Sequence, residues 1–269
     1  MSARSDQDSD TANAAAVVPR LPDGRVLVGE RTHTARSWPG TVAFPGGGLE
    51  DIDRHLPLLE GEGLPEETRA ARACALRELG EEVALWRFAR ADGRRDPAVS
   101  ARAAAALLDG AQLHDVLARE QLVLDDRGLM PLTLWRVPSG RFAVQQFLLA
   151  LDAEPELTKP ATDELTAVRW VTPRALLADW RAGRAFLLSP IRRVVTGLAA
   201  HEGDPAAAMR ELSQPPTDAE RARLDLVEGA CILAARSATL PPATHTNAVL
   251  LGGLSGSAFI IDPAAHWAD

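Results

Sequence analysis

The feature that most constrains this chain is a group of three glutamates on a predicted helix. Glu78, Glu81 and Glu82 are spaced i, i+3 and i+4, so they share one side of a helix. A proline and two acids in the first turn predict that this helix runs from Pro65 to Val83. The other side carries an apolar stripe that predicts packing on a core: Leu76, Leu79 and Val83.

Three carboxylates on one side of a helix repel one another, and a hard divalent cation reverses the sign of that interaction. Oxygen ligands of this kind suit Mg²⁺ or Mn²⁺. Upstream, a glycine-rich turn over residues 44–48 allows the backbone to approach a metal or a phosphate closely. Arg77 precedes the glutamates and is placed to pin a loop or a carboxylate. A solvated acidic face is the alternative for the glutamates alone, and the turn and the arginine favour the metal site.

Together these residues resemble the signature of the Nudix hydrolases, in which a glycine and a spacer precede Arg-Glu-apolar-x-Glu-Glu-x-Gly-apolar. Residues 77–85 match this signature except at Ala84, where glycine is usual. Gly47 and Arg77 are 30 positions apart (77 − 47), far more than in the compact motif, which implies an insertion. The spacer glutamate of the motif therefore has no certain equivalent, and Glu66 and Glu67 are both candidates.

Within that superfamily, the insertion resembles the one in the coenzyme A diphosphatase branch. An upstream pattern also resembles that branch, with threonine in place of the usual small residue: Arg31, Thr32, Arg36, Gly40 and Phe44-Pro45-Gly46-Gly47. The resemblance covers residues 14–200. It implies metal-dependent hydrolysis of a nucleoside diphosphate linked to another moiety, with coenzyme A or acyl-coenzyme A as the favoured substrate. Two alternatives stay open, a hydrolase of NADH, ADP-ribose or another nucleotide, and a non-catalytic nucleotide-binding module.

The resemblance also implies roles for single residues. Glu81 and Glu82 are expected to bind Mg²⁺ or Mn²⁺, and Glu78 is either a third ligand, which we favour, or the general base. Glu78, Glu81 and Arg77 are the expected catalytic residues. The carbonyl of Gly46 or Gly47 is a candidate further ligand, and Gly46 is also expected to contact the substrate.

Outside the helix, Arg31 and Arg36 are candidates for binding phosphates, including the 3′-phosphate of coenzyme A. The alternative for both is a surface arginine in an arginine-rich chain. Glu164 precedes a predicted strand, where it is either an additional acid of the site or part of a solvated loop. Trp38 is a candidate for stacking on an adenine or for a structural role, and His33 is more typical of a turn than of a catalyst.

The mixture of short strands and helices predicts an α/β (α+β) fold, and the resemblance implies an α/β/α sandwich around a mixed sheet. We expect a disordered lead-in over 1–13, a Nudix domain over 14–200, a helical linker over 201–240 and a β-hairpin tail over 241–269. Both cysteines, Cys74 and Cys231, lie in apolar segments that predict helices and core packing. Further helices are expected over 101–122 with a break near Asp109, and over 174–181, 190–200 and 217–235.

The tail resembles the first hairpin of a metallo-β-lactamase-fold hydrolase, with strands over 247–252 and 258–262. The His-x-His-x-Asp-His metal motif of that fold is absent from this sequence, so the tail cannot supply that chemistry. Two interpretations stay open. The tail is either a truncated part of a fusion between the two folds, or a hairpin that packs on the main sheet.

The charge balance bears on partners. A net charge of −8 repels DNA and anionic membranes, which argues against non-specific binding to either. No apolar stretch approaches the roughly 18 residues of a membrane span, and the N-terminus lacks the apolar core of a signal peptide. We therefore expect a cytoplasmic protein whose partner is a small nucleotide diphosphate bound through metal. A homodimer and a further metallo-β-lactamase-like domain stay open.

Overall fold

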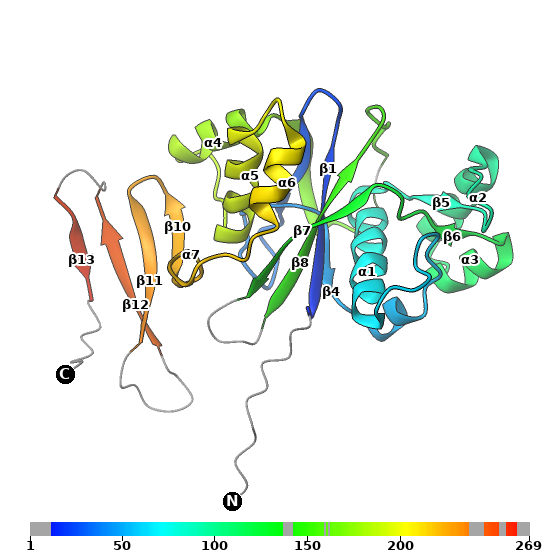
Figure 1. Cartoon of the computed structure of the whole chain (residues 1–269), viewed down its shortest axis with the longest axis horizontal. Helices are drawn as coiled ribbons and strands as arrows, with labels where there is room; N and C mark the ends of the chain where they lie inside the picture. Colours follow the sequence, from blue (N-terminus) through cyan, green and yellow to red (C-terminus); the bar gives the residue numbers. More distant parts are fainter. Residues whose placement is uncertain are drawn as a thin grey trace, which may run out of the picture.

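A seven-stranded mixed sheet forms the centre of the molecule (Figure 1). The computed structural model describes residues 12–136, 142–158, 160, 162–236, 245–252 and 257–262, so most of the expected lead-in lies outside it. The main strand order is β3-β2-β1-β8-β7, with β4 paired to β1 and β9 paired to β2. Only β1 and β8 run parallel among these pairs. The strands are β1 (Ala14–Arg20), β2 (Val26–Arg31), β3 (Val42–Ala43), β4 (Gly46–Gly48), β7 (Leu129–Arg136), β8 (Ala143–Ala150) and β9 (Leu165–Val171).

Helices cover both faces of this sheet (Figure 1). On one face lie α1 (Glu66–Val83) and the short 3-10 helix η1 (Asp51–Arg54), and on the other lie α4 (Pro173–Arg181), α5 (Ser189–Ala200) and α6 (Pro205–Leu212). Because successive strand residues point to opposite faces, Phe147 joins the core under α1 while Leu148 joins the core under α4–α6. The expected α/β/α sandwich with a mixed sheet is confirmed.

Beside α1 lies a smaller unit of two helices and two short strands. It comprises β5 (Phe88–Ala89), α2 (Pro97–Leu108), α3 (Leu113–Glu120) and β6 (Val123–Leu124). Asp96 caps α2 by accepting hydrogen bonds from two backbone amides, and Pro97 occupies the first turn. The predicted break near Asp109 is confirmed, since Gly110 follows it with φ 89°. Apolar residues of both helices join the core under α1.

The helix expected over 217–235 is wrong beyond residue 222. The structure has α7 (Asp218–Ala222) and then an antiparallel sheet of β10 (Arg223–Val227), β11 (Ala230–Arg236), β12 (His245–Leu251) and β13 (Phe259–Ile261). Gly229, at φ 78°, turns the chain between β10 and β11. Cys231 is buried as predicted, but on a strand. The predicted hairpin is confirmed as β12–β13; it pairs with β11, and not with the main sheet.

Across the described residues, no helix is both long and apolar enough to cross a bilayer.

Candidate metal and diphosphate site

The three glutamates lie in the last turns of α1, close to the centre of the sheet. The helix begins after Pro65 and ends at Val83, so the predicted bounds are confirmed to within one residue. Ala84 ends the helix in the left-handed conformation, with φ 55°, and its amide reaches back to the carbonyls of Gly80 and Leu79. That conformation explains why glycine is usual at this position of the signature, since glycine has no Cβ to clash there.

The glycine-rich segment is a strand, and the prediction of a turn there is wrong. Gly46–Gly48 forms β4, which pairs with β1 and packs under α1. A Cβ at Gly46 would lie 2.5 Å from the carbonyl oxygen of Ala15, and one at Gly47 would lie 2.4 Å from Oε1 of Glu78. The amide of Gly46 donates a 2.8 Å hydrogen bond to Oε2 of Glu82. The absence of a Cβ at Gly47 therefore lets the Glu78 carboxylate lie against the backbone, while the Gly46 amide holds the Glu82 carboxylate there.

Glu78 and Glu82 are buried, so a solvated acidic face is excluded for these two side chains. Burial raises the pKa of Glu82 to about 8; the Gly46 amide opposes this shift, while the charges of Glu78 and Glu164 add to it. Burial likewise raises the pKa of Glu78 to about 7, against Arg77 and with Glu81 and Glu164. Burial also raises the pKa of Glu81, which is the most exposed of the three. Keeping these buried carboxylates ionised is energetically unfavourable unless a cation compensates their charge.

Arg77 supplies part of that compensation and ties three elements together. Its Nε and Nη2 donate to the two carboxylate oxygens of buried Asp53 at 2.8 and 3.0 Å. Its Nη1 donates to Glu78 and Glu81 at 2.8 and 2.9 Å, and Nη2 also donates to the carbonyl of Gly48. The guanidinium therefore joins η1, β4 and α1, which agrees with the prediction that it pins a loop or a carboxylate.

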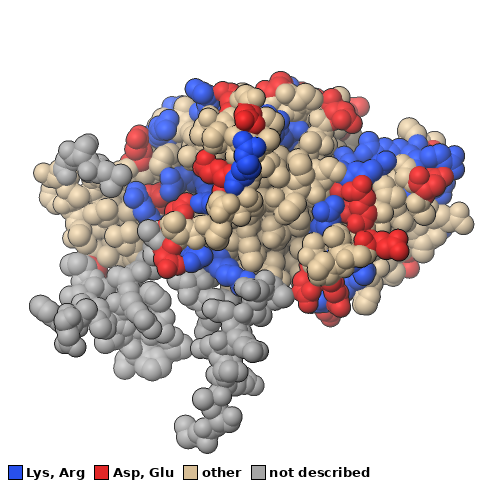
Figure 2. All heavy atoms as spheres, viewed as in Figure 1, with Lys and Arg blue, Asp and Glu red and all other residues tan. Residues whose placement is uncertain are grey.

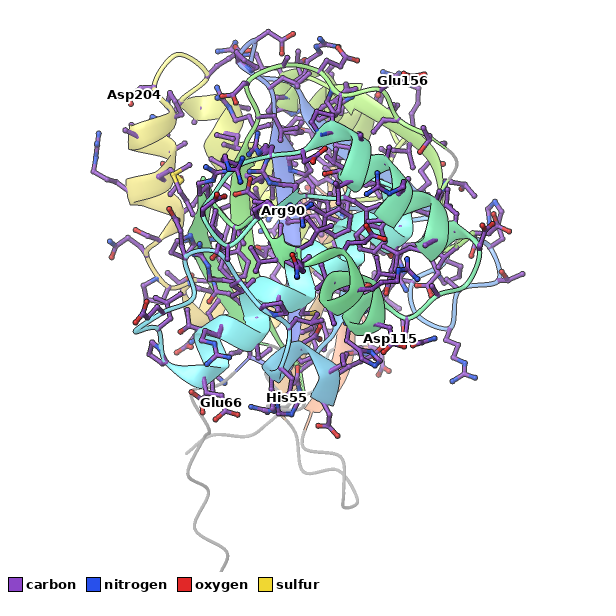
Figure 3. All side chains as sticks on the ribbon, turned by 90° about the vertical axis from the view of Figure 1, so that its right-hand side faces the viewer. His55, Glu66, Arg90, Asp115, Glu156 and Asp204 are labelled. Carbon is purple, nitrogen blue, oxygen red and sulfur yellow. The ribbon has the colours of Figure 1, made fainter. Side chains whose placement is uncertain are left out.

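Asp53 is the residue of this site that the sequence prediction missed. Neither Glu66 nor Glu67 pairs with Arg77. Glu66 lies at the edge of the molecule (Figure 3), where it pairs with Arg54, and Glu67 is exposed. The sequence did contain a signal for Asp53, namely its position: it is an acidic residue only six positions after Gly47 (53 − 47), before the insertion begins.

The donor set fits a hard divalent cation. Within the described residues, no three acidic, histidine or cysteine side chains already converge on one point. Arg77 holds Glu78 and Glu81, while the Gly46 amide holds Glu82. The burial of these carboxylates and their mutual repulsion favour a cation beside them. Because every side-chain donor is a carboxylate oxygen, Mg²⁺ or Mn²⁺ suits the set.

Comparison with known proteins shows which family this geometry resembles. No protein-family model matches the chain. The chain resembles a crystal structure of a NUDIX hydrolase from Alicyclobacillus acidocaldarius, with 27% identity, a TM-score of 0.60, and coverage of 77% of this chain and 99% of that one. A curated relative from Caenorhabditis elegans, named as a nudix hydrolase, is 28% identical over 171 residues. The chain is therefore similar in sequence and in fold to Nudix hydrolases. The match to the curated relative spans 62% of this chain but only 52% of the relative.

The remaining residues that the sequence predicts for this site differ in how strongly their charges act on the carboxylates. The charge of Arg31 lowers the pKa of Glu82, and Arg31 Nε donates to the carbonyl of Ser37. The charge of exposed Glu164 acts on both Glu78 and Glu82, and its carbonyl accepts from the amide of Thr32. The charges of Arg31 and Glu164 therefore act on the buried carboxylates. Exposed Arg36 forms no ion pair with any residue that the structure describes. The same loop carries His33 and Trp38, both exposed.

Proposed function

We propose that this protein is a Nudix hydrolase that cleaves the diphosphate bond of a nucleoside diphosphate linked to another moiety, using Mg²⁺ or Mn²⁺. The observation that carries the proposal is the pair of buried carboxylates, Glu78 and Glu82, held against the Gly46–Gly47 backbone. A doubly charged diphosphate would be repelled from such a site. A divalent cation bound there would neutralise both partners and would lower the pKa of a coordinated water.

In this proposal each residue has a separate task. Glu78 and Glu82 bind the metal, with Glu81, Glu164 and the carbonyl of Gly47 as further candidate ligands. Arg77 is a positioning residue, because it holds Glu78 and Glu81 from its anchor on Asp53. The general base is one of the acids that is not coordinated to the metal.

For the substrate we propose coenzyme A or acyl-coenzyme A. Two features that resemble the coenzyme A diphosphatase branch support this substrate: the insertion before α1 and the upstream arginine pattern. Within that pattern, the charge of Arg31 acts on Glu82. Arg36 is exposed on the same loop, where it is accessible to a phosphate group. NADH and ADP-ribose are the alternative substrates, since they carry the same diphosphate.

One assay tests the reaction and the substrate together. The full chain is incubated with Mg²⁺ or Mn²⁺ and coenzyme A, acetyl-coenzyme A, NADH or ADP-ribose, and the products are separated by chromatography. We expect 3′,5′-ADP and (acyl-)4′-phosphopantetheine. Cleavage of NADH or ADP-ribose alone would retain the chemistry but overturn the coenzyme A assignment.

Two matched variants tie the activity to the carboxylates. Glu82→Gln should lower kcat at least roughly 100-fold through loss of a metal ligand. Glu67→Gln removes the same charge from the exposed first turn of α1 and should keep the wild-type rate. Thermal unfolding checks that both variants fold. A wild-type chain that cleaves no diphosphate, or a Glu82→Gln chain with unchanged kcat, would leave a non-catalytic nucleotide-binding module as the better account.

The C-terminal sheet has no part in this reaction as we propose it. Its strand β10 contacts α4 and α5 through the hydrogen bond from Trp180 Nε1 to Leu226 and through the Arg192–Asp225 pair. These helices cover the face of the main sheet that is opposite α1. The metallo-β-lactamase-like resemblance of the β12–β13 hairpin therefore concerns a separate part of the chain.

A further inference from the structure

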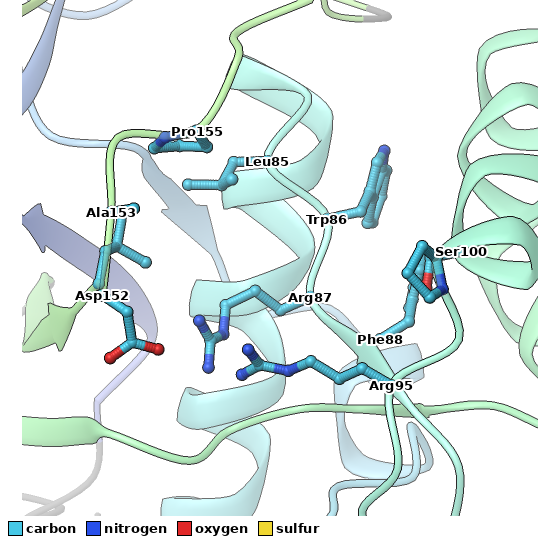
Figure 4. Close-up of a pocket in the computed structure, with 11 residues that line it drawn as sticks. Leu85, Trp86, Arg87, Phe88, Arg95, Ser100, Asp152, Ala153 and Pro155 are labelled. Atoms are coloured by element: carbon cyan, nitrogen blue, oxygen red, sulfur yellow. The ribbon is translucent and has the colours of Figure 1, made fainter.

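A cavity of about 310 Å³ lies beside the C-terminal end of α1, between β5, the start of α2 and the segment that follows β8 (Figure 4). Trp86 and Phe88 contribute to its lining, and their rings stack with centroids 5.6 Å apart. Arg87 and Arg95 extend into the same space and point towards Asp152 (Figure 4). The cavity therefore combines the partly exposed Trp86 ring, which stacks on the buried Phe88, with two neighbouring guanidinium groups.

These arginines belong to a group with excess positive charge. The carboxylate of Asp125, which is fully buried, accepts from Arg95 Nε at 2.7 Å and from Arg127 at 2.8 Å, and lies 3.9 Å from Arg87 Nη2. Three guanidinium groups and one carboxylate leave a net charge of +2 (3 − 1). Exposed Asp152 forms no ion pair with the described arginines and offsets this charge only in part. Such an excess is notable in a chain of net charge −8.

The hydrogen bonds that Arg87 and Arg95 make around Asp125 leave their other guanidinium N–H groups available. Arg87 donates from Nε and Nη2 to the carbonyls of Asp125 and Arg127, and Arg95 donates from Nε to the Asp125 carboxylate. Among the described residues, Nη1 of Arg87 and both terminal nitrogens of Arg95 have no acceptor. Because these hydrogen bonds hold both guanidinium groups in place, the two groups are preorganised to bind one anion with several hydrogen bonds.

We propose that this cavity binds a small organic phosphate, with the phosphate on Arg87 and Arg95 and the organic group against the exposed part of the Trp86 ring. Its volume is within the range of small-molecule sites. The site is distinct from the carboxylates. Trp86 packs on Gly80, where a Cβ would lie 2.1 Å from its ring, and Gly80 is about 200° around the helix from Glu78. The inference does not depend on the proposed hydrolysis.

A neighbouring hollow of about 690 Å³ provides the comparison. It shares Arg95 and also has Arg90 and Arg94 in its lining, and Figure 2 shows basic side chains gathered at this end of the molecule. Arg94 is paired with Asp92 at 2.7 Å, and Arg90 donates to the carbonyls of Glu120 and Gln121. Arg94 is therefore an exposed arginine next to Arg95 in the chain that does not line the proposed site.

The test measures binding to the full chain by isothermal titration calorimetry, with EDTA present so that metal-dependent binding at α1 is removed. The ligands are adenosine 5′-monophosphate, inorganic phosphate and adenosine. We expect the monophosphate to bind more tightly than inorganic phosphate, and adenosine to bind most weakly. Arg95→Gln should weaken binding of the monophosphate roughly tenfold through loss of charged hydrogen bonds, while Arg94→Gln should change it less than about twofold.

Three results would overturn the inference. Wild-type protein could fail to bind either phosphate ligand at roughly 10 mM, a concentration that detects even very weak complexes. Arg94→Gln could weaken binding as much as Arg95→Gln, which would indicate general surface charge. Glu82→Gln could abolish binding, which would locate the ligand at the carboxylates of α1. Because Arg95 is half exposed and makes a single hydrogen bond, its variant should fold, and thermal unfolding checks this.

Discussion

At the scale of single residues, Gly47 sets how closely the backbone and the Glu78 carboxylate approach. In Gly47→Ala the new Cβ would lie 2.4 Å from Oε1 of Glu78 and force the carboxylate away. We expect kcat to fall roughly 100-fold, because a ligand displaced by an ångström no longer meets the metal. Gly48→Ala is the control, since nothing lies within 4 Å of its Cβ. Steady-state kinetics should show a lower kcat for Gly47→Ala than for Gly48→Ala. Equal kcat values would contradict the claim that the lack of a side chain at Gly47 positions the Glu78 carboxylate.

Asp53 is the second residue whose contribution can be measured. Asp53→Ala leaves the Arg77 guanidinium buried without its principal partner, which should reduce the free energy of unfolding by about 3 kcal/mol. Glu66→Ala removes a carboxylate from an exposed ion pair and should change the same quantity by less than about 1 kcal/mol. Urea unfolding of both variants makes the comparison. Similar losses would mean that the Asp53–Arg77 pair is not a buried anchor.

At the scale of elements, the end of α1 has a residue that is poorly suited to its backbone. Ala84 adopts φ 55°, a conformation that costs an L-residue roughly 1–2 kcal/mol relative to glycine. Ala84→Gly should therefore raise the free energy of unfolding by about 1 kcal/mol in urea titrations. Ala182→Gly, at the end of α4 with φ −84°, should not stabilise the chain. A destabilised Ala84→Gly chain would show that the Cβ makes packing contacts that outweigh the strain.

Local sequence signals explain which secondary-structure elements can be predicted from the sequence and which cannot. Clear end signals and apolar periodicity located α1, α2 with α3, α4 and α5, because those preferences are local. The strand β11 was predicted as helix because Ala230-Cys-Ile-Leu-Ala-Ala235 is rich in a strong helix former. Its strand conformation depends on pairing with β10 and β12, which no local preference encodes. Likewise, the spacing within one helix predicts the glutamates, whereas Asp53 is 24 residues from Arg77 and reaches it only because the chain between them folds back.

The small unit formed by β5, β6, α2 and α3 has its own electrostatic anchor, Asp125. Burial opposes ionisation, but hydrogen bonds from Arg127 and Arg95 and the nearby charge of Arg87 prevail and lower the pKa of Asp125 to about 2. Its ordinary value is 3.8, so as the pH falls the unfolded chain takes up this proton first, and acid favours unfolding. The resulting stabilisation, about 2 kcal/mol, is present above pH 4 and is lost between about pH 4 and pH 2.

Urea unfolding as a function of pH measures this contribution. Asp125→Asn should be less stable than the wild type at pH 6, and the difference should shrink towards pH 2, where the wild-type carboxylate also becomes protonated. Asp115→Asn, at an exposed position on α3 (Figure 3), should follow the wild-type curve. A difference that stays constant from pH 6 to pH 2 would show that the lost stability comes from packing and not from the charge.

At the scale of the whole molecule, the main sheet separates two regions with different tasks. The carboxylates, η1 and the α2–α3 unit lie on the side of α1, whereas the C-terminal sheet contacts the helices of the other face (Figure 1). Asp225 fixes that contact, because its buried carboxylate accepts from Arg192 at 2.5 Å and from Arg223 at 2.6 Å. Replacing this residue should therefore loosen the C-terminal sheet and leave the carboxylate site unchanged.

Asp225→Ala leaves two arginines next to a buried position without their carboxylate, so β10 and β11 should open more often. We expect limited proteolysis within residues 223–236 to become roughly tenfold faster. A decrease of about 1.4 kcal/mol in the free energy of local opening raises the population of the open, cleavable form tenfold. The kcat/KM for the diphosphate substrate should stay within about twofold of the wild type, because α4 and α5 lie across the sheet from α1. Asp218→Ala removes the exposed carboxylate of an ion pair on α7 and should leave both quantities unchanged. A large fall in kcat/KM for Asp225→Ala alone would show that the two faces of the sheet are coupled, and that the C-terminal sheet supports the carboxylate site through the main sheet.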